Sequence, residues 1–401
     1  MSKLKELIQQ YCPDGVPNKT LGELGKFFGG LTGKSKDDFT DGNAKFITYK
    51  NVYANPALQI DVEDRVKIAG GEKQRTLQYG DVVFTGSSET PDECGISSVV
   101  TVKTEEKLYL NSFCFFFRFD DLSIMLPDFA KHLFRSNELR YQIGKTASGV
   151  TRYNVSKKLM EKVSIPVPPL PVQREIVRIL DKFTALIAEL TAELTARKKQ
   201  YEFYRDKLLT FGDVQGGATG DVVWRTLAEI ADISTGSSNT DDAVEGGCYP
   251  FFVRSQQPLA KDEYEYDEEA IITAGDGVGV GKVFHYINGK YALHQRAYRI
   301  HPATDGLLGK YLYHYFVATF PKYIGQQMYQ GSVPSIRRPM LNKFQVAIPS
   351  LDVQSRIVNV LDNFDAICSD LKIGLPAEIE ARKKQYEFYR EKLLAFHEIS
   401  N

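Results

Sequence analysis

The sequence contains no uninterrupted apolar run long enough to cross a membrane. The N-terminal segment, Met1 to Gln10, also lacks the apolar stretch and the small-residue cleavage site of a secretory signal peptide. These absences predict a chain that stays in the cytoplasm. With 401 residues and 43% hydrophobic content, the chain has enough apolar material for two or three domains with cores of their own.

Cysteine is scarce, and neither sign of charge dominates. The five cysteines are scattered and never form a C-x-x-C pair, which argues against a disulfide framework and against a zinc ribbon. The formal net charge is −1, with 50 Lys and Arg against 51 Asp and Glu. This balance provides no overall attraction to nucleic acid or anionic lipid, so any nucleic-acid surface must be built locally.

Recognisable catalytic motifs are also missing. Gly29 to Ser35 (GGLTGKS) looks like a phosphate-binding loop, but Phe28 stands where the G-x-x-x-x-G-K-[ST] pattern needs its first glycine. Gly275 to Lys282 (GDGVGVGK) fits neither that pattern nor G-x-G-x-x-G and is better explained as a glycine-rich hairpin. The histidines are dispersed, and G-x-S-x-G is absent. No active site is therefore expected, although an enzyme with an unfamiliar site remains an alternative.

The sequence does contain a long internal repeat. Arg197 to Leu209 (RKKQYEFYRDKLL) returns as Arg382 to Leu394 (RKKQYEFYREKLL), and the two copies differ only by Asp206 against Glu391. The copies begin at residues 197 and 382, a domain-sized period that is far longer than the repeat of a solenoid. The chain is therefore predicted to consist of two homologous halves.

Both halves are predicted to be α+β bodies with short mixed strands and one main helix each. In the first half the pattern predicts strands at 45–49, 81–85, 97–102 and 113–119 and a helix at 127–143. In the second half it predicts strands at 249–253, 270–273, 281–286 and 291–300 and a helix at 307–320. Ahead of the first body, residues 3–11 predict a short amphipathic helix that ends before Pro13.

Each body is followed by a long helical segment. From Gln173 to Phe211, apolar and aromatic residues recur at spacings of four and three, the heptad pattern of a coiled coil. At 1.5 Å per residue this helix would be roughly 58 Å long, too long to be buried in one small domain. The second segment continues its apolar seam through Leu371 but has a four-residue insertion with Gly374 and Pro376, which predicts a stutter and a kink. The two helices are predicted to pack as an antiparallel coiled coil.

Polar and basic loops occupy matching places in the two bodies, and their side chains suit DNA contacts. The DNA-binding candidates of the first body are Lys34, Ser35, Lys36, Tyr49, Lys50, Asn51, Ser87, Ser88, Thr151, Arg152 and Tyr153. Those of the second body are Ser237, Arg254, Gln256, His294, Gln295, Arg296, Ser335, Arg337 and Arg338. Arg337 and Arg338 are the strongest candidates for reading bases, with ordinary surface arginines as the alternative.

With these features together, the sequence resembles the specificity (S) subunit of type I restriction-modification systems over essentially its whole length. The resemblance rests on LGELGKFFGGLTGKS, AKFITYKNV, GSVPSIRRPML, the Q-R-E-I motif with its counterpart VQSRI, and ARKKQYEFYR in both long helices. It implies two α/β target-recognition domains, each reading one part of a split, asymmetric DNA site, joined by two long helices in an antiparallel coiled coil. Asp352 and Ser355 replace Pro171 and Arg174 of the first half, so the partner contacts there stay open.

The resemblance also implies a non-catalytic role in host defence. The S subunit would recruit two methyltransferase (M) subunits and two restriction (R) subunits, which would hold S-adenosylmethionine, ATP and Mg²⁺, with no cofactor or metal in this chain. The implied parts are an N-terminal helix and turn (1–19), target-recognition domain 1 (20–168), long helix 1 (169–212), a linker (213–221), target-recognition domain 2 (222–349) and long helix 2 (350–397). A coiled-coil scaffold with two protein-binding heads and no DNA reading is the main alternative.

The repeated box is predicted to bind partners as well as to pack. Packing alone would not keep Lys198, Lys199, Glu202 and Arg205 equal to their counterparts in the second copy, because these positions lie off the seam. Tyrosine and arginine are also typical interface anchors. The partner-binding candidates are Arg197, Lys198, Lys199, Tyr201, Tyr204, Arg205, Arg382, Lys383, Lys384, Tyr386, Tyr389 and Arg390. They predict two equivalent docking sites for two identical subunits, with simple packing of the coiled-coil tip as the alternative.

Overall fold

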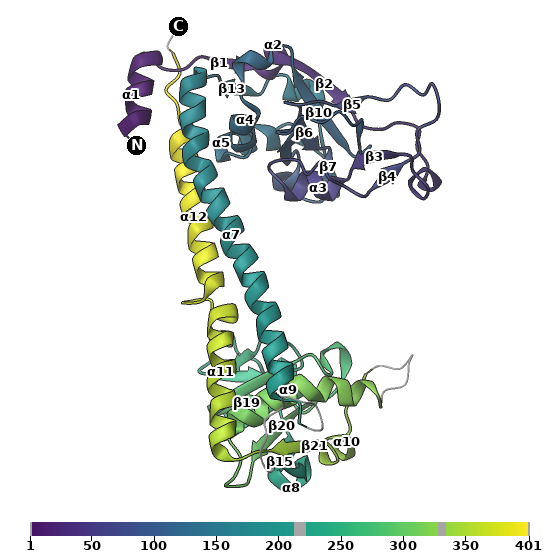
Figure 1. The fold of residues 1–401 in the computed structure, drawn as a ribbon, viewed down its shortest axis with the longest axis vertical. Helices are drawn as coiled ribbons and strands as arrows, with labels where there is room; N and C mark the ends of the chain where they lie inside the picture. The colour runs from purple at the N-terminus through teal and green to yellow at the C-terminus, as the bar shows by residue number, and fades with distance from the viewer. Residues whose placement is uncertain (1, 212–221, 328–333, 400–401) are drawn as a thin grey trace. The chain divides into compact units, whose positions relative to one another are not determined.

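The computed structural model of the chain describes residues 2–211, 222–327 and 334–399 (Figure 1). The chain forms two compact units: unit 1 is Met1–Glu189 with Ile379–Asn401, and unit 2 is Leu190–Glu378. Each unit combines one α/β body with parts of the long helices. We call the body of unit 1 (residues 20–168) head 1 and that of unit 2 (residues 222–327 and 334–349) head 2. Within the described residues, no helix is long and apolar enough to cross a membrane.

Head 1 contains two four-stranded sheets. The antiparallel sheet has the order β2-β10-β6-β8, formed by β2 (Gly25–Gly29), β10 (Cys114–Phe119), β6 (Val82–Thr85) and β8 (Ser97–Val99). The second sheet has the order β4-β3-β9-β5, formed by β4 (Arg65–Val66), β3 (Ala44–Ile47), β9 (Leu108–Leu110) and β5 (Thr76–Leu77). In this sheet β3 and β9 run parallel. The structure confirms the four predicted strands as β3, β6, β8 and β10.

The first predicted strand of head 1 ends earlier than expected. Tyr49 belongs to the short helix α3 (Tyr49–Ala54) and not to β3. The reason is local, because the Thr48 side chain accepts a hydrogen bond from the Asn51 N–H and caps the helix at its first turn. This cap turns residues 49–51 away from the sheet.

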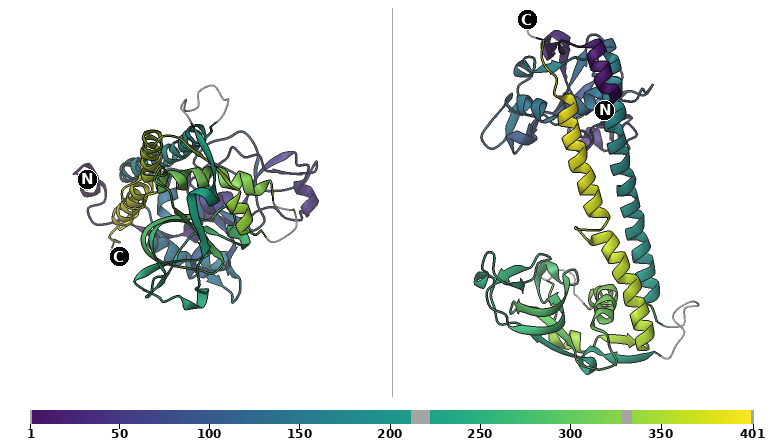
Figure 2. Two further views of the ribbon diagram at one scale, coloured as in Figure 1. Left: turned by 90° about the horizontal axis from the view of Figure 1, so that it is seen from below. Right: turned by 90° about the vertical axis from the view of Figure 1, so that its left-hand side faces the viewer.

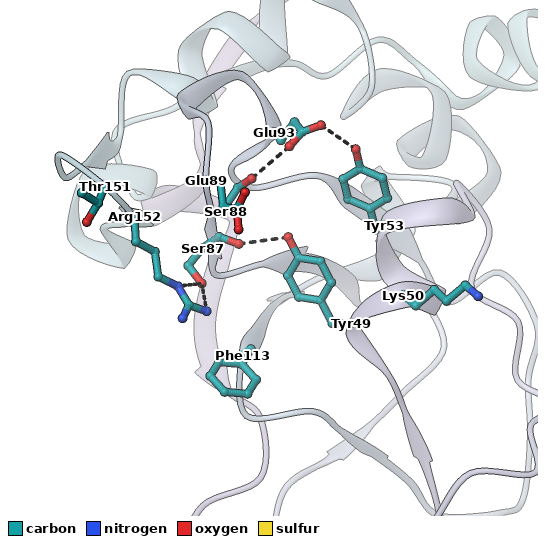
Figure 3. Close-up of a pocket in the computed structure, with 10 residues that line it drawn as sticks. All are labelled: Tyr49, Lys50, Tyr53, Ser87, Ser88, Glu89, Glu93, Phe113, Thr151 and Arg152. Carbon is teal, nitrogen blue, oxygen red and sulfur yellow. Dashed lines mark hydrogen bonds between the residues drawn. The ribbon is translucent and has the colours of Figure 1, made fainter. Parts of the chain in front are cut away.

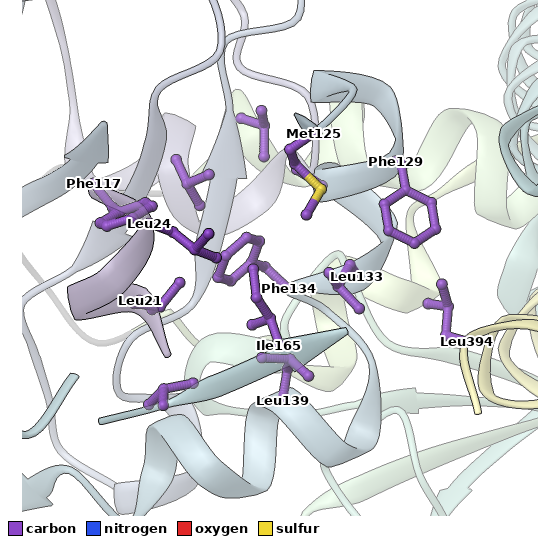
Figure 4. Close-up of a cluster of buried hydrophobic side chains, with 14 of the residues drawn as sticks. Leu21, Leu24, Phe117, Met125, Phe129, Leu133, Phe134, Leu139, Ile165 and Leu394 are labelled. Atoms are coloured by element: carbon purple, nitrogen blue, oxygen red, sulfur yellow. The ribbon is translucent and has the colours of Figure 1, made fainter. Parts of the chain in front are cut away.

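The predicted helix at 127–143 is wrong as a single helix. The structure divides it into α4 (Pro127–Leu133) and α5 (Asn137–Gly144). The Ser136 hydroxyl donates to the Leu133 carbonyl oxygen at 2.7 Å, which takes up one of the last carbonyls of α4. Both helices bury their apolar faces in the core of head 1, together with Leu21, Leu24, Phe117, Met125, Ile165 and Leu394 (Figure 4).

The N-terminal residues form a helix and a strand that belong to unit 1. The predicted helix at 3–11 is confirmed as α1 (Ser2–Tyr11). The following strand β1 (Asn18–Thr20) pairs antiparallel with β13 (Ser164–Pro166) and so joins the beginning of head 1 to its end. At the start of α2 (Leu21–Leu24), the Thr20 hydroxyl and N–H both donate to Glu23 Oε2, at 2.6 and 2.7 Å, which is a capping box.

Head 2 is built on a six-stranded sheet with the order β15-β20-β18-β19-β16-β17. Its strands are β15 (Ala231–Thr235), β20 (Ala297–Pro302), β18 (Tyr266–Ala274), β19 (Phe284–Leu293), β16 (Tyr249–Phe252) and β17 (Leu259–Lys261). β16 and β19 run parallel, as β3 and β9 do in head 1. The predicted helix at 307–320 is confirmed as α9 (Gly309–Gly325), which packs its apolar residues in the same core cluster as Ile271 and Ile300 of the sheet.

The predicted strands at 281–286 and 291–300 have the wrong bounds. A single long strand, β19, pairs with β18 from residue 284 to residue 291, and the chain reverses only at His294–Arg296. His294 is buried, and its Nδ1 accepts the Arg296 N–H at 2.9 Å, which closes the turn. Asn288 and Gly289, a common hairpin signal, instead lie inside β19 opposite β18.

Head 2 repeats the frame of head 1. β14 (Val223–Thr226) pairs with β21 (Gln345–Ile348) in the way that β1 pairs with β13. The capping box also recurs at α8 (Leu227–Ile230), where the Thr226 hydroxyl and N–H donate to Glu229 Oε2 at 2.7 and 2.6 Å. The same cap in the same place shows that the halves are structural repeats.

A buried glutamine secures each head to a long helix. In unit 1, Gln173 Oε1 accepts the Leu126 N–H at 2.8 Å, and its Nε2 donates to the carbonyl oxygens of Ile124 and Pro168, both at 2.7 Å. In unit 2, Gln354 makes the same three bonds, with the Leu308 N–H at 2.9 Å and with the carbonyl oxygens of Gly306 and Pro349 at 2.8 Å. Both side chains are fully buried.

The first predicted long helix is confirmed as α7 (Leu170–Leu208), whereas the second, predicted at 350–397, is wrong as one helix. It consists of α11 (Leu351–Ser369) and α12 (Leu375–Leu394). After α11, Asp370 Oδ1 accepts hydrogen bonds from the backbone N–H groups of Lys372 and Ile373, at 2.6 and 3.1 Å. These bonds stabilise the turn at which α11 has ended. Pro376 then falls in the first turn of α12, where its missing N–H is tolerated. An irregularity near Gly374 and Pro376 is thus confirmed, but it is a complete break between two helices and not the predicted kink within one. Leu371 is 81% exposed and takes no part in the seam.

Each copy of the repeated box packs with the head of the other half (Figures 1 and 2). In unit 1, α12 lies antiparallel beside the first part of α7, and the ring of Tyr389 stacks on Phe183 with 5.2 Å between centroids. In unit 2, the last part of α7 lies against α11, and Tyr204 stacks on Phe364 at 5.9 Å. Both stacks lie within the offset range of favourable aromatic pairs. The predicted antiparallel coiled coil is therefore confirmed within each unit.

Candidate nucleic-acid interface

Each head has a surface hollow at the same place in its fold. In head 1 the hollow lies between α3, which follows β3, and β7 (Ser87–Ser88), which follows β6, and its volume is about 620 Å³. In head 2 it lies between residues 253–255, which follow β16, and the short η5 helix (Gly277–Gly279), which follows β18, and its volume is about 350 Å³. The two hollows are therefore equivalent positions of the repeat.

A closing loop forms the third wall of the hollow in head 1 (Figure 3). Between β11 (Ala147–Ser148) and β12 (Tyr153–Val155) the chain reverses through Gly149, whose φ is +154° and whose Cβ, if present, would lie 2.0 Å from the Arg152 carbonyl oxygen. β12 also pairs with β7. This pairing fixes Thr151 and Arg152 at the rim of the hollow.

Hydroxyl groups and a carboxylate form a connected network in this hollow (Figure 3). The Tyr49 hydroxyl donates to the Ser87 carbonyl oxygen at 2.9 Å. The Tyr53 hydroxyl and the Ser88 hydroxyl donate to the two oxygens of Glu93, at 2.9 and 3.2 Å. The hydrogen bond from Tyr53 is the main cause that lowers the pKa of Glu93, so this carboxylate stays ionised and can accept further hydrogen bonds.

An arginine and an aromatic ring complete the hollow of head 1. Arg152 donates from Nε and Nη2 to the Ser87 hydroxyl oxygen, at 3.1 and 2.9 Å. Its guanidinium carbon lies 5.5 Å from the centre of the Phe113 ring, within the range of a cation–π contact. Phe113 is 57% exposed, which is unusual for a large aromatic side chain. The hollow therefore presents an oriented guanidinium beside an accessible apolar ring.

The hollow of head 2 presents a different set of side chains. Asp276 follows β18 and accepts a hydrogen bond on each oxygen, from Arg254 Nη1 at 2.7 Å and from Arg296 Nη1 at 3.1 Å. Partial burial acts to raise the pKa of Asp276, but the hydrogen bonds and charges of the two arginines outweigh burial and lower it. The result is a fixed carboxylate with two guanidinium groups attached.

The closing loop joins the hollow in the same way in both heads. In head 1 the Val155 N–H donates to the Gly86 carbonyl oxygen at 2.9 Å, just before Ser87. In head 2 the Ile336 N–H donates to the Gly275 carbonyl oxygen at 2.7 Å, just before Asp276. Asp276 also forms an antiparallel bridge with Ser335. Ser87 and Asp276 therefore occupy equivalent places, each immediately after a central strand.

The DNA-binding candidates of head 1 fall into two groups. Those that line the hollow are Tyr49, Lys50, Ser87, Ser88, Thr151 and Arg152, with Tyr153 adjoining them in β12. The structure places the others in different surroundings. Asn51 bonds to the backbone of Gln59, and the Lys34 ammonium lies 2.7 Å from Glu72 Oε2 and 2.6 Å from the Lys67 carbonyl oxygen. Ser35 precedes and caps the short η1 helix, in which Lys36 is the first residue.

The candidates of head 2 are distributed differently. Arg254 and Arg296 meet at Asp276, with Ser335 opposite. His294 is buried in the turn that carries Arg296, and Gln295 bonds to the Asn239 side chain. Of the candidates in head 2, Arg254 alone lines the hollow, and Arg296 reaches it through Asp276. Ser237, Gln256, Arg337 and Arg338 are exposed and lie outside it. Arg337 and Arg338 lie at the start of α10 (Arg338–Asn342), so their role in base reading stays a prediction.

Several residues that line the hollows were not predicted from the sequence. Among them are Tyr53, Glu93 and Phe113 in head 1 and Asp276 in head 2. Phe113 precedes a strand of buried aromatic residues, and the sequence does not show that it alone remains outside the sheet. Asp276 lies in the glycine-rich stretch that failed the phosphate-loop patterns. A single carboxylate between glycines directly after a strand was the available signal for it.

The tyrosines of the repeated box belong to the packed face of the helices. In unit 1, the Tyr386 hydroxyl lies 2.8 Å from His132 Nδ1, and His132 Nε2 lies 2.7 Å from an oxygen of Asp181. In unit 2, the Tyr201 ring lies 6.1 Å from the Phe364 ring, between centroids. The tyrosine candidates Tyr201, Tyr204, Tyr386 and Tyr389 therefore contribute to packing, the alternative that the sequence left open.

The prediction that Arg205 lies off the packed face is wrong. Its side chain is 23% exposed, and that of its counterpart Arg390 is 12% exposed. Arg205 bonds to Asp206 through Nε and Nη2, at 3.0 and 2.8 Å, and Arg390 bonds to Glu391 through the same atoms, both at 2.7 Å. Each guanidinium also covers the tyrosine four residues earlier, which explains its burial.

The box also has an exposed face that is the same in both copies. Phe203 is 62% exposed and its counterpart Phe388 is 61% exposed. The candidate lysines Lys198, Lys199, Lys383 and Lys384 are also exposed. Arg197 is exposed and contacts Glu193 and Gln200 of its own helix, whereas Arg382 is half-buried and contacts Gln385. The two phenylalanines were missed as candidates, although their identity in the two copies was visible.

Comparison with known proteins identifies the family. The sequence matches the family described as Type I restriction modification DNA specificity domain over residues 13–197 and 220–381. A type I restriction enzyme specificity subunit of Escherichia coli is 35% identical over 269 residues, which cover 60% of this chain and 65% of that protein. A putative type I restriction enzyme specificity subunit of Haemophilus influenzae is 34% identical over 269 residues, which cover 62% of this chain and 68% of that protein.

Two solved structures share the fold. The S subunit of a type I restriction-modification system from M. genitalium has a TM-score of 0.58 and 14% identity, covering 94% of this chain and 96% of that one. A chain from a study of assembly and conformational transition of the type I R-M system has a TM-score of 0.59 and 18% identity, covering 95% and 97%. At these identities the likeness concerns the fold alone. Two repeated heads, two repeated helical segments and a family match across both halves agree: the chain belongs to the family of type I restriction-modification specificity subunits.

Proposed function

We propose that this chain reads a bipartite, asymmetric DNA site for a type I restriction-modification enzyme and holds the catalytic subunits, without an active site of its own. The observation that carries the proposal is the pair of equivalent hollows with different side chains. Ser87 stands in head 1 where Asp276 stands in head 2. Tyr49 and Arg254 are also equivalent, because each stands two residues after the strand, β3 or β16, that pairs in parallel with β9 or β19. Two equivalent sites with different donors and acceptors suit two different half-sites.

The side chains in the hollows have the chemistry of direct base reading. Arginine donates two hydrogen bonds to guanine, a carboxylate accepts from the cytosine amino group, and apolar side chains contact the thymine methyl group. Head 1 offers Arg152, Glu93 and the exposed ring of Phe113 in one hollow. Head 2 offers Arg254 with Val278, which is 89% exposed. Each hollow can therefore distinguish base pairs and need not rely on phosphate contacts alone.

The two exposed faces of the repeated box are proposed to dock two M subunits. Phe203 and Phe388 are equally exposed, and large aromatic side chains are frequent anchors of protein interfaces. Two identical surfaces in one chain are what two copies of the same partner require. The R subunits would join this assembly, and S-adenosylmethionine, ATP and Mg²⁺ would be bound by the M and R subunits.

The formal net charge of −1 shapes the expected binding behaviour. Affinity for duplex DNA comes largely from phosphate neutralisation, which depends on the number of Lys and Arg contacts. The isolated chain is therefore expected to bind DNA weakly. The M subunits would supply additional backbone contacts in the assembled enzyme, whereas this chain would supply the sequence preference.

The test is a methylation map of the reconstituted enzyme. The full chain is assembled with its M subunits and S-adenosylmethionine, presented with a library of random duplexes, and the methylated sequences are read. We expect one motif with two separated parts of different sequence, and no motif when the M subunits act without this chain. Methylation by the assembled complex without sequence preference would instead support the scaffold with protein-binding heads. Turnover by the isolated chain would support an enzyme.

A further inference from the structure

In head 2, the carboxylate of Asp276, in the turn that follows β18, contacts two arginines from different parts of the sheet. Arg254 follows β16, and Arg296 lies in the turn between β19 and β20. Asp276 contacts both, one on each carboxylate oxygen, and its side chain is 26% exposed while those of Arg254 and Arg296 are 40% and 60% exposed. The carboxylate therefore lies beneath two guanidinium groups that remain accessible to solvent.

Each arginine keeps a complete donor edge for an external ligand. Both bonds to Asp276 use an Nη1 atom, and the described residues provide no hydrogen-bond partner for Nε or Nη2 of Arg254 or Arg296. The Nε–H and one Nη2–H of a guanidinium point in parallel and match two neighbouring acceptors. Guanine presents such a pair in the major groove, O6 and N7.

We infer that Asp276 is a positioning residue that presents Arg254 and Arg296 to guanine bases in the half-site read by head 2; this inference rests on the proposed DNA-reading function. A shared carboxylate restricts the rotation of both long side chains before DNA binds. Less side-chain freedom is then lost on binding, which strengthens the contact with the correct base. Arg254 and Arg296 thereby replace Arg337 and Arg338 as the main candidates for base reading.

The surroundings favour a base over a phosphate as the ligand. The hollow beside Arg254 is lined by Val253 and by the exposed Val278. Apolar walls add nothing to phosphate binding, whereas they can contact the thymine methyl group or a base edge. Asp276 also removes one of the two positive charges locally, which weakens a pure phosphate site but leaves the donor geometry intact.

Head 1 has a smaller version of the same device. Ser87, at the position equivalent to Asp276, holds the single guanidinium of Arg152 through its hydroxyl oxygen. A neutral hydroxyl accepts hydrogen bonds from one arginine here, whereas the carboxylate of Asp276 serves two. The half-site of head 1 is therefore expected to depend on one arginine held by Ser87, and that of head 2 on two arginines held by Asp276.

The test uses the full chain reconstituted with its M subunits and a methylation map for each variant. Arg254→Lys and Arg296→Lys keep the charge but lose the planar fork, so each should relax one guanine position of one half of the motif, by roughly 10- to 100-fold in discrimination. Asp276→Ala should relax the same half, although both arginines are still present. The other half of the motif should remain unchanged in all three variants, which shows in the same molecules that the complex has folded and assembled.

Ser87→Ala is the matched control, because it removes the equivalent support from head 1. It should relax only the half of the motif that the three head 2 variants leave intact. The inference is overturned if Arg254→Lys and Arg296→Lys behave like the wild type, or if the variants lower methylation of all sequences uniformly, since either result marks phosphate contacts. A wild-type complex that methylates no defined motif would instead overturn the proposed function itself.

Discussion

Head 1 and head 2 share a frame and differ in the hollow that the frame supports. The frame includes Gln173 and Gln354, which make the same three backbone hydrogen bonds in the two units. The hollow places Ser87 in one head where Asp276 stands in the other. The same backbone support therefore holds different side chains in the two hollows, which fits the proposal that each head reads its own target on a common fold.

The long helices show the opposite balance. The two copies of the repeated box place equivalent tyrosines in equivalent stacks: Tyr389 stacks on Phe183 in unit 1, and Tyr204 stacks on Phe364 in unit 2. The two copies differ in sequence only at Asp206 and Glu391, and each of these carboxylates accepts a hydrogen bond from the arginine that precedes it. Diverged heads and equal helix tips fit the proposed function, in which the two heads bind different half-sites and the two tips bind the same subunit twice.

Disrupting the exposed face of the box should have the largest effect. Phe203→Asp or Phe388→Asp alone should reduce the bound M subunits from two to one, and the double variant should leave none, because a charge replaces an exposed apolar anchor. Native mass spectrometry of the reconstituted complex measures the stoichiometry. Ala188→Asp, an exposed position of α7 outside the box, is the control and should keep both subunits. Two bound M subunits in the double variant would contradict equivalent docking.

Removing the buried glutamine of either unit should have the next largest effect. Gln173→Ala or Gln354→Ala leaves three backbone groups without their partner, and each should cost about 2–4 kcal/mol in the free energy of unfolding. Urea denaturation followed by circular dichroism measures the loss. Gln385→Ala, at an exposed position of α12, should change stability by less than about 0.5 kcal/mol. Clearly unequal losses at 173 and 354 would show that the two frames are not equivalent.

Acid should destabilise both units through equivalent histidines. Burial is the main cause that lowers the pKa of His132 and of His314 from 6.5, although Asp181 and Asp362 oppose it. The unfolded chain therefore binds more protons, so stability falls as the pH drops below about 6.5 towards the folded pKa values. Burial acts to raise the pKa of Asp181, but hydrogen bonds from His132 and Lys131 keep it below 3.8, outside this window.

Denaturation curves at several pH values between 7.5 and 5 test this expectation. In His132→Gln or His314→Gln the pH dependence of stability should become shallower, by a similar amount in the two variants. An unchanged slope in either variant would show that its histidine does not cause the acid sensitivity of that unit.

Removing the hydroxyl of either capping box should cause the smallest loss of stability. Thr20→Ala and Thr226→Ala each remove a hydroxyl that bonds to a glutamate in the first turn of a short helix, and each should cost about 1 kcal/mol. Thermal unfolding of the two variants measures the loss. Serine at either position keeps the hydroxyl and should restore most of the stability.

Much of the framework was predictable because it depends on local patterns. The identical boxes reveal the repeat, and the spacing of apolar residues predicts the α+β heads and the first long helix. Gly374 and Pro376 mark the place where the second helical segment is interrupted. Two errors in the strand bounds have identifiable structural causes. Thr48 caps a helix where a strand was expected to continue, and the Asn288–Gly289 pair stays within β19 because β18 offers it a long partner strand.

The hollows were only partly predictable because they depend on distant contacts. Ser87 and Arg152 were both candidates, but their hydrogen bond joins residues 65 positions apart, and nothing in the sequence pairs them. Asp276 gained its role only when the sheet brought together Arg254 and Arg296, which are 22 and 20 positions away. Similarly, the burial of Arg205 depends on a neighbouring carboxylate and a tyrosine ring, which the heptad pattern did not reveal.

The most direct measurement is the methylation motif of an enzyme in which head 2 is replaced by a second copy of head 1. Residues 20–168 would replace residues 222–349 between the unchanged helices, and the chain would be reconstituted with its M subunits. If each head reads its own half-site on a common frame, the motif should contain the head 1 half-site twice and lose the head 2 half-site. An assembled, active complex that still methylates the original motif would contradict this account.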